Sequence, residues 1–477
     1  FFILILEEFK KYIQGKNVAI MGVGISNRPL IRYIYSLGAK ITAFDSLSED
    51  DVVLSKTIAN MKADGIDIEW SVGEGYLKGL ANKDFDIIFR TPKMRNDVPE
   101  LVEAVKKGSV LSSEMEVFMA LCPCKIFAIT GSDGKTTTTT LVSEMLKAGG
   151  YNVYLGGNIG TPLLDKIDEI VSTDMVVLEL SSFQLLTMSQ SADVAVITNI
   201  TPNHLDVHKS YEEYQESKTN IFKNQTAFGK IILNGKCEIT RAMLSLARGR
   251  KCLFALEEEN ATGNSNLIAS SYVKDGVLTY SYKGITTPIV NERDIIIPGK
   301  HNVENYLTAI SCVIDYVDVK DIVKVATNFR GVEHRIELVR ELDGVRYINS
   351  SIDTSPNRTI NTMNALFDRN EKGVLIAGGA DKKCHYEGLG VAILNVCDRI
   401  VLIGSNAPQI KDILSKECGD KKYSLFEFDD YDEALNKARE LAHPGELVIL
   451  SPVGTSYDRF RHFEERGKLF KDMVNKL

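Results

Sequence analysis

The sequence predicts an α/β protein with three domains, and three observations lead to this prediction. The chain has 477 residues, enough for about three domains of ordinary size. Short apolar runs alternate with helical segments near both ends of the chain, which is typical of parallel sheets covered by helices. Between them, a glycine turn joins an apolar strand to a helix. We expect Rossmann-like domains at residues 1–113 and 332–477, and a phosphate-loop (P-loop ATPase-type) α/β domain with appended antiparallel strands at 114–331.

Composition excludes several classes of function. A hydrophobic content of 44% and a charged content of 25% are ordinary for a soluble globular protein. The net charge of −8 argues against a nucleic-acid partner. The apolar start, residues 1–6, is too short for a membrane span or a signal and could begin an amphipathic helix through Tyr12. The eight cysteines are scattered. We therefore expect a cytoplasmic protein with reduced thiols and no membrane partner.

The central domain opens with the strongest motif of the chain, Thr130-Gly-Ser-Asp-Gly-Lys-Thr-Thr137. Residues 126–129 predict a buried strand, and a helix is expected from Lys135 to Ala148. Backbone N–H groups of such a turn, together with the helix dipole, form a concave site for phosphate oxygens.

Two side chains in this motif suit a nucleotide. Lys135 would place a positive charge on the terminal phosphates, and the Thr136 hydroxyl would bind Mg²⁺. The general nucleotide pattern would have glycine at position 129, where this chain has Ile129. The bland alternative, a glycine turn without a ligand, leaves the Lys-Thr pair unexplained.

The first domain contains a second glycine turn, in Asn17-Val-Ala-Ile-Met-Gly-Val-Gly-Ile-Ser-Asn27. Gly22 and Gly24 are followed by Asp45, about 20 residues on, as in a dinucleotide site. The third glycine of that pattern is missing, because Asn27 stands in its place. We therefore expect this turn to bind another nucleotide's diphosphate in preference to NAD.

Three predicted strands of the central domain end in polar residues, at Thr130, Glu179 and His204. The carboxyl ends of parallel strands meet at one edge of a sheet, where ligands collect. Glu179 and His204 would therefore face the same site as Lys135. The alternatives are a solvated strand end for Glu179 and an ordinary loop histidine for His204.

The remaining chain shows two further patterns. Residues 253–298 alternate between apolar and polar with Gly and Asn turns, which predicts antiparallel hairpins appended to the central sheet. A helix is expected from about residue 300 to Tyr316. The α/β rhythm then returns, with expected strands at Arg346–Asn349, Gly373–Ala377, Arg399–Ile403, Ser424–Phe428 and Glu446–Leu450.

These motifs occur in an order that resembles the Mur ligase family over essentially the whole chain. They are the phosphate loop, Gly157-Asn-Ile-Gly160, Leu178-Glu-Leu-Ser-Ser-Phe-Gln184, Asn203-His-Leu-Asp206, Gly299-x-His-Asn-x-x-Asn305, His334-Arg335 and the segment from Ser451 to Glu464. The string after Glu179 resembles the branch of the family that adds D-glutamate.

The resemblance implies an ATP-dependent acid–D-amino-acid ligase. Its substrates would be ATP, UDP-N-acetylmuramoyl-L-alanine and D-glutamate, and the reaction would pass through an acyl phosphate. A carboxylate is a poor electrophile, so its phosphorylation supplies both activation and a leaving group. The resemblance also implies two Mg²⁺ sites, a carbamylated lysine and a monomer.

The resemblance carries over to individual residues. The catalytic residues would be Lys135, Glu179, His204, Lys218 and Arg335. ATP would meet Gly131, Ser132, Asp133, Gly134, Lys135, Thr136, Thr137, Asn302, Asn305, Arg335 and Ser350. The UDP-linked substrate would meet Gly24, Ile25, Ser26, Asp45, Asn158 and His204, and D-glutamate would meet Lys382, Ser456 and Phe463. The metal ligands would be Thr136, Glu179, His204 and carbamylated Lys218, which on the sequence alone is an ordinary surface lysine.

Departures from the family pattern leave alternatives open. Ser350 stands where the family usually has an aspartate, and Asp353 follows three residues later. Residues 91–93, Thr-Pro-Lys, replace a Ser-Pro-Gly that is usual near the uridine site, and Ala380 replaces a residue that is often polar. A folylpolyglutamate-type ligase, a catalytically silent nucleotide-binding relative and an NAD oxidoreductase are the competing interpretations.

Overall fold

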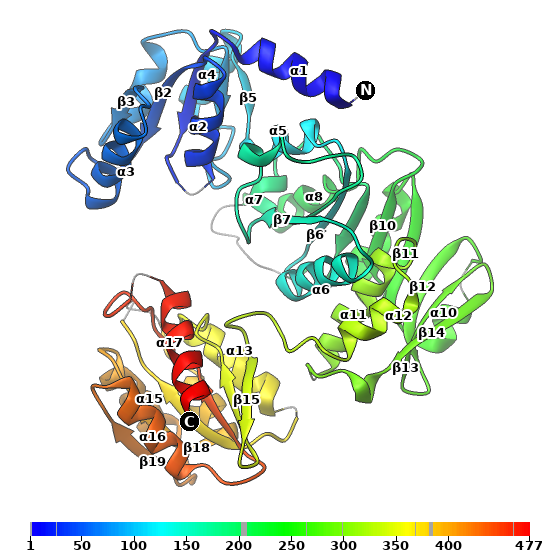
Figure 1. Cartoon of the computed structure of the whole chain (residues 1–477), viewed down its shortest axis with the longest axis vertical. Coiled ribbons are helices and arrows are strands. Elements are labelled where there is room, and N and C mark those ends of the chain that lie inside the picture. The colour runs from blue at the N-terminus through cyan, green and yellow to red at the C-terminus, as the bar shows by residue number, and fades with distance from the viewer. Residues whose placement is uncertain are drawn as a thin grey trace. The chain divides into compact units, whose positions relative to one another are not determined.

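The chain forms two compact units in the computed structural model, which describes residues 2–24, 26–201, 208–263, 265–297, 299–367, 369–380, 385–460 and 462–477. The first unit comprises Phe1–Asp294 and Val303–Thr327, and the second comprises Ile295–Asn302 and Asn328–Leu477. The described residues build three sheets, two in the first unit and one in the second (Figure 1). Each sheet falls within one of the three expected segments, while the domain boundaries at 113 and 331 stay predictions.

A five-stranded parallel sheet forms the N-terminal part of the first unit, in the order β3-β2-β1-β4-β5. Its strands are β1 (Asn17–Met21), β2 (Lys40–Asp45), β3 (Glu69–Val72), β4 (Ile87–Phe89) and β5 (Val110–Ser112). The helices of this region are α1 (Phe2–Ile13), α2 (Asn27–Ser36), α3 (Val52–Ala63), α4 (Pro99–Lys106) and α5 (Glu114–Leu121). The strand order reverses at β1, so the glycine turn after β1 lies where such sheets bind ligands.

A nine-stranded sheet forms the rest of the first unit, in the order β14-β13-β12-β11-β10-β9-β6-β8-β7. Its strands are β6 (Lys125–Thr130), β7 (Val153–Gly157), β8 (Met175–Glu179), β9 (Val194–Ile197), β10 (Lys230–Asn234), β11 (Arg250–Leu256), β12 (Ile268–Lys274), β13 (Val277–Tyr282) and β14 (Ile285–Asn291). Its helices are α6 (Lys135–Ala148), α7 (Ser182–Leu185), α8 (Tyr211–Thr219), α9 (Glu238–Ala242), α10 (Glu258–Thr262), α11 (Lys300–Val313) and α12 (Val319–Ala326). β6 is flanked by β8 and β9 and is buried from Ile126 onward, as its apolar run predicts.

The antiparallel part of the central sheet is smaller than expected. β11 pairs with β10 in parallel, and β12 pairs with β11 in parallel. The direction changes only at β12–β13 and β13–β14, where two-residue loops at Asp275-Gly276 and Lys283-Gly284 have positive φ at both positions. The prediction of antiparallel hairpins is therefore confirmed from β12 to β14, which includes Ser271–Tyr280, and was wrong for β11 and its pairing with β12. The short helix α10 lies between these strands and gives the chain the length to return for a parallel pairing.

The second unit contains a six-stranded sheet in the order β15-β16-β20-β17-β18-β19. Its strands are β15 (Glu337–Leu342), β16 (Val345–Asn349), β17 (Gly373–Ala377), β18 (Cys397–Leu402), β19 (Ser424–Glu427) and β20 (Leu447–Leu450). Its helices are α13 (Pro356–Phe367), α14 (Leu389–Val396), α15 (Ala407–Glu417), α16 (Tyr431–Leu441) and α17 (Phe463–Lys476). The five expected strands are confirmed to within two residues, and β15 is an additional antiparallel edge strand joined to β16 by Asp343-Gly344.

Polar residues start several helices as the sequence dictates. The side chains of Asp51, Ser113, Ser210 and Asp430 accept hydrogen bonds from backbone N–H groups in the first turns of α3, α5, α8 and α16. Ser181 and Gln184 form a capping box at α7, which gives the string after Glu179 a structural role. In the described part of the chain, no helix is long and apolar enough to span a membrane, and all seven cysteines there are free.

Candidate active site

The phosphate loop after β6 needs both of its glycines. Gly131 has φ +146°, and a Cβ there would lie 1.8 Å from Thr198 Oγ1. Gly134 has φ +76°, and a Cβ there would lie 2.6 Å from Asn305 Oδ1. The loop therefore passes so close to the neighbouring strand and to α11 that only glycine fits. α6 begins directly afterwards at Lys135, as expected.

Two residues at the end of β9, which sequence reasoning missed, hold this loop. Asn199 Oδ1 accepts hydrogen bonds from the backbone N–H groups of Ser132 at 3.0 Å and Asp133 at 2.8 Å. Thr198 Oγ1 donates to the carbonyl oxygen of Asp133 at 2.6 Å. The available signal was the polar pair that follows the apolar run of β9, because β9 is the neighbour of β6 in the sheet.

Lys135 and Thr136 are the first two residues of α6, directly after the loop. Lys135 Nζ donates to the carbonyl oxygens of Gly131 at 3.0 Å and Ser132 at 2.8 Å, so its charge lies against the loop. Thr136 Oγ1 donates to Glu179 Oε2 at 2.8 Å. Thr137 is buried in the first turn of α6. A cation and a hydroxyl therefore stand at the start of one helix.

Glu179, at the end of β8, is only 2% exposed, so it is no solvated strand end. Its Oε1 accepts from Asn158 Nδ2 at 2.9 Å, while Oε2 accepts from Thr136. The structure thus brings three predicted residues together. A carboxylate and a hydroxyl are oxygen donors of the kind Mg²⁺ prefers, and Mg²⁺ usually takes few protein ligands. The described side chains include no group of three or more His, Cys, Asp or Glu placed to hold a metal.

Lys218 on α8 is 1% exposed, so its interpretation as an ordinary surface lysine was wrong. Its Nζ donates to the carbonyl oxygen of Gly131 at 3.0 Å and to Thr130 Oγ1 at 3.3 Å. The ammonium also lies 4.7 Å from the centre of the Tyr214 ring. Burial, with a smaller contribution from the charge of Lys135, lowers the pKa of Lys218 to about 7. A large share of the amine is therefore neutral near pH 7.

The aromatic surroundings of Lys218 were not predicted. Tyr214 OH and Ser132 Oγ share a hydrogen bond of 2.9 Å, which joins α8 to the phosphate loop. His208 packs edge-on against Tyr214, stacks on Phe183 and pairs with Ser182 Oγ at 2.9 Å. Burial lowers the pKa of His208. His204 lies outside the described residues.

Asn302 and Asn305, both expected to meet ATP, lie on α11, where the division between the two units falls after Asn302. Asn305 is 8% exposed and its Oδ1 accepts from Thr138 Oγ1 at 3.2 Å. The backbone N–H of Asn302 donates to the carbonyl oxygen of Gly299 at 2.9 Å in the first turn. Asn305 is thus fixed beside the phosphate loop, in contact with α6.

The glycine turn after β1 is closed by polar side chains. Asp45 Oδ2 accepts from the backbone N–H of Val23 at 2.9 Å, and Oδ1 accepts from that of Leu47 at 3.0 Å. Asn27 Nδ2 donates to the carbonyl oxygens of Met21 at 3.1 Å and Gly22 at 2.8 Å. Asn27, which stands where the third glycine would be, therefore stabilises the turn through its side-chain hydrogen bonds. Gly24 and Ser26 line this turn, and Ile25 lies outside the described residues.

In the second unit, Ser350 and Asp353 lie next to each other in the loop that follows β16. Both are buried, and Ser350 Oγ accepts from the backbone N–H of Ile336 at 3.3 Å. Asp353 accepts from Ser451 Oγ at 2.7 Å and also from Ser350. Burial raises the pKa of Asp353 to about 6, against the opposing effect of these bonds and of Arg335. A carboxylate is thus present beside Ser350.

The expected D-glutamate residues belong to the same unit. Ser456 is 2% exposed, and the half-buried ring of Phe463 packs edge-on against His334 with the centroids 6.0 Å apart. Lys382 lies outside the described residues. Sequence reasoning missed Arg466, which is 0% exposed. Its guanidinium donates to Ser351 Oγ and to the carbonyl oxygens of Ser351, Gly454 and Thr455 at 3.0–3.2 Å.

The arrangement in the first unit can bind a nucleoside triphosphate and transfer its terminal phosphoryl group. It has a glycine loop, a lysine, a hydroxyl and a carboxylate on adjacent strand ends of one sheet. The class of protein defined by the fold and this site is therefore a nucleotide-dependent enzyme built from three α/β sheets.

Comparisons with known proteins agree. The family model described as "Mur ligase middle domain" matches residues 129–313, and "Mur ligase, glutamate ligase domain" matches residues 334–454. UDP-N-acetylmuramoylalanine–D-glutamate ligase of Acetivibrio thermocellus is 50% identical over 476 residues, covering 99% of both chains. The enzyme of the same name from Ruminiclostridium cellulolyticum is 47% identical, also with 99% coverage of both chains. The chain belongs to the Mur ligase family, and within it to the UDP-N-acetylmuramoylalanine–D-glutamate ligases.

A solved structure shows the same fold. UDP-N-acetylmuramate-alanine ligase MurC from Thermotoga maritima superposes with a TM-score of 0.56 at 19% identity, covering 97% of this chain and 99% of that chain. The fold class predicted from the sequence is thereby confirmed.

Proposed function

We propose that the chain joins D-glutamate to UDP-N-acetylmuramoyl-L-alanine with ATP, as a cytoplasmic monomer in peptidoglycan precursor synthesis. The observation that carries this proposal is the junction of Lys135, Thr136 and Glu179 at the phosphate loop, in a chain 50% identical along its length to such a ligase. A purely structural glycine loop would not need a cation, a hydroxyl and a buried carboxylate together, whereas stabilising charge in phosphoryl transfer does.

The reaction follows from the chemistry of the substrates. A carboxylate oxygen of the L-alanine moiety attacks the terminal phosphorus of ATP, and the bond from that phosphorus to ADP breaks. The amine of D-glutamate then attacks the acyl carbon of the acyl phosphate, loses a proton, and displaces inorganic phosphate. The protein's task in both steps is positioning and charge neutralisation. Lys135, held against the loop by two carbonyl oxygens, supplies part of that neutralisation.

Thr136 and Glu179 are the residues that would hold Mg²⁺. When bound there, the ion would neutralise phosphate charge. Glu179 is held in place by Asn158 and Thr136, so its carboxylate is already oriented toward the start of α6. By family resemblance, His204 and carbamylated Lys218 would hold a second ion.

Lys218 is suited to carbamylation because its amine is buried and its pKa is lowered to about 7. The neutral nitrogen forms a bond to the carbon of CO₂ and releases one proton, and the product is an anionic oxygen donor. Incubation with ¹³C-labelled bicarbonate should give a carbamate NMR signal in the wild type that Lys218→Ala lacks. A spectrum unchanged by that substitution would contradict the assignment.

Binding roles follow the family pattern. Gly24, Ile25, Ser26, Asp45 and Asn158 would meet the UDP-linked substrate, and Lys382, Ser456 and Phe463 would meet D-glutamate. The buried charge of Arg466, held on neutral acceptors next to Thr455, adds positive potential for an amino acid with two carboxylates.

Asp353 supplies the carboxylate that position 350 lacks. Its side chain accepts a hydrogen bond from Ser350, so the negative charge stays within one side chain of the usual position. Ser350→Asp alone would place two buried carboxylates together, which costs stability. The pair Ser350→Asp with Asp353→Ala should restore the melting temperature and keep the ATP KM. Equal melting temperatures for Ser350→Asp and the paired variant would contradict this exchange.

Phosphate release tests the function. With ATP, Mg²⁺ and UDP-N-acetylmuramoyl-L-alanine, release should require D-glutamate, and L-glutamate should give no more than the reaction without amino acid. No release with any amino acid, alongside measurable ATP binding, would instead support a catalytically silent relative.

A further inference from the structure

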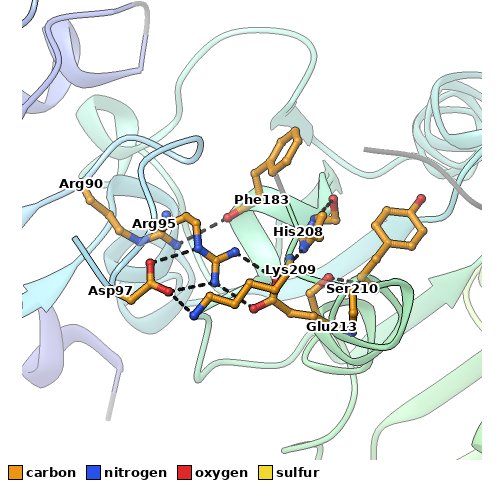
Figure 2. A network of polar contacts seen from close by, with 11 residues as sticks. Arg90, Arg95, Asp97, Phe183, His208, Lys209, Ser210 and Glu213 are labelled. Atoms are coloured by element: carbon orange, nitrogen blue, oxygen red, sulfur yellow. Dashed lines mark hydrogen bonds and ion pairs between the residues drawn. The ribbon is translucent and has the colours of Figure 1, made fainter. Parts of the chain in front are cut away.

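The segment Arg90–Asp97 connects the two sheets of the first unit. It leaves the first sheet after β4 and makes polar contacts with α7, with Thr187 just beyond it, and with the start of α8, all in the region of the central sheet (Figure 2). We call it the bridge segment. Its residues 91–93 are those that depart from the family's Ser-Pro-Gly, and neither Arg90 nor Arg95 was assigned a role above.

Arg90 fixes the shape of the bridge segment and its place against α7. Its guanidinium is 1% exposed, and Nη1 donates to three carbonyl oxygens of the segment, those of Thr91, Pro92 and Met94, at 2.9–3.2 Å. On its other side, Nε donates to Thr187 Oγ1 at 3.1 Å, and Nη2 donates to the carbonyl oxygen of Phe183 at 3.4 Å. Since a buried guanidinium needs its donors satisfied, segment and helix are held together.

The start of the bridge segment lies over the glycine turn of the first sheet. A Cβ added to Gly22 would lie 2.5 Å from Thr91 Cγ2, so this threonine packs directly on the turn. A ligand in the turn would therefore sit next to a loop whose backbone Arg90 holds.

The end of the bridge segment is joined to α8 by a ring of four charges (Figure 2). Arg95 Nη1 and Nη2 donate to the two carboxylate oxygens of Glu213, each at 2.9 Å. Arg95 also donates to both oxygens of Asp97, at 3.0 and 3.2 Å. Lys209 closes the ring, because its side chain pairs with Asp97 and its backbone N–H donates to Glu213 at 2.7 Å. The bonds from Arg95 lower the pKa values of Asp97 and Glu213 to about 2.

Helix α8 carries this connection to the phosphate loop within two turns. Tyr214, next to Glu213, shares a hydrogen bond with Ser132 of the loop, and Lys218 donates to Gly131. Ser210 caps the helix by accepting from the backbone N–H of Glu213, so α8 does not depend on the Glu213 side chain to form.

We propose that Arg95 and Glu213 are positioning residues that couple the substrate turn of the first sheet to the ATP loop. The proposal rests on the proposed function, because it takes the turn as the UDP-substrate site and the loop as the ATP site. Coupling between the two sites is measured as the change that one ligand makes in the affinity for the other. If the bridge carries it, each ligand raises the affinity for the other by the same factor.

The test is calorimetric titration of a non-hydrolysable ATP analogue with Mg²⁺, in the absence and in the presence of saturating UDP-N-acetylmuramoyl-L-alanine. In the wild type we expect the second ligand to tighten binding at least about fivefold. In Arg95→Ala and in Glu213→Gln this factor should fall toward one. The exchanged pair, Arg95→Glu with Glu213→Arg, should recover part of it.

The chain offers a matched control in the second unit, where Arg346 forms an equivalent two-pronged pair with Glu371, Nη1 to Oε1 at 2.8 Å. Arg346→Ala loses a comparable ion pair and should keep the wild-type factor. Both arginine variants will lower the melting temperature, so only the coupling factor separates positioning from general stability.

Three outcomes would overturn the proposal: no coupling in the wild type, an unchanged factor in Arg95→Ala, or an equal loss in Arg346→Ala. None of them bears on the proposed function, which stands or falls with D-glutamate-dependent phosphate release by the wild type. Conversely, coupling that disappears in Arg95→Ala without any phosphate release would support the bridge and reject the ligase reaction.

Discussion

The first unit contains two strand–turn–helix motifs with glycine turns. They look alike in sequence and differ in chemistry. One runs from β1 through Gly22 into α2, and the other from β6 through Gly131 into α6. Each leads out of an interior strand of its sheet, and in both cases an acid is the last residue of a neighbouring strand, Asp45 of β2 and Glu179 of β8.

The two acids show the difference. The two Asp45 oxygens accept hydrogen bonds from the backbone N–H groups of Val23 and Leu47, so this carboxylate shapes the turn. The Glu179 oxygens instead accept from the side chains of Thr136 and Asn158, which can move aside for a cation. Under the proposed function, the same local fold would serve substrate binding in one sheet and the reaction in the other.

The comparison predicts its largest effect at Lys135, which has no counterpart at the first turn. Lys135→Ala should lower kcat about 10²–10³-fold, because it removes one charge-stabilising group aimed at the transferred phosphoryl group. The KM for UDP-N-acetylmuramoyl-L-alanine should change little. Steady-state kinetics with each substrate varied in turn will measure both. A change in the KM for UDP-N-acetylmuramoyl-L-alanine with an unchanged kcat would refute the assignment of Lys135 to the reaction.

Lys218 provides the second contrast, through pH. Its folded pKa of about 7 lies below its ordinary value of 10.5, so the unfolded chain binds more protons between these values. The wild type is therefore progressively destabilised as pH falls from about 10 to 7, and the penalty is constant below that. Lys218→Met lacks the penalty.

Denaturant titrations in CO₂-free buffer will test this. The free energy of unfolding of Lys218→Met minus that of the wild type should grow as pH falls from 10 to 7 and then level off. A difference that is flat between pH 7 and 10 would show that the amine is solvated.

How much of this could be predicted from the sequence depends on how local the cause is. Lys135, Thr136 and the helix starting there follow from adjacent residues, and the strands of the parallel sheets follow from apolar runs. The direction of β11 and β12 depends on crossovers, and the edge strand β15 is half-buried without a clear alternation. Its one signal was the turn Asp343-Gly344.

The site shows the same limit. The position of Glu179 could be predicted because an acid directly ends an apolar run there, and the carboxyl ends of parallel strands meet at one edge of a sheet. The burial of Lys218 and the role of Asn199 could not, because both depend on how α8 and β9 pack against β6. Residues far apart in the chain, such as Arg95 and Glu213, carry no mark of their pairing in the sequence.

Asp45 should give an intermediate effect that separates the two turns. Asp45→Asn keeps one acceptor oxygen but turns an N–H₂ group toward a backbone N–H, with a loss of about 1–3 kcal/mol. We expect the KM for UDP-N-acetylmuramoyl-L-alanine to rise about tenfold, with kcat and the ATP KM unchanged. Glu179→Gln, the matched substitution at the other turn, should instead lower kcat. Equal kinetic profiles for the two amides would remove the distinction between a binding acid and a reaction acid.

The smallest effect is expected at Gly22, where space and backbone strain can be separated. Gly22→Ala meets Thr91 Cγ2 at 2.5 Å and has φ +77°, so both a clash and a strained backbone oppose it. Thr91→Ser removes that methyl group. The double variant Gly22→Ala with Thr91→Ser should therefore lose the clash but keep about 1–2 kcal/mol of backbone strain. Gly24→Ala, with nothing within 4 Å of its Cβ, is the matched control for stability. In denaturant titrations, the free energy of unfolding should be highest for Gly24→Ala, lower for the double variant and lowest for Gly22→Ala. If Thr91→Ser gives no recovery, the bridge segment does not pack on this turn as tightly as the structure shows.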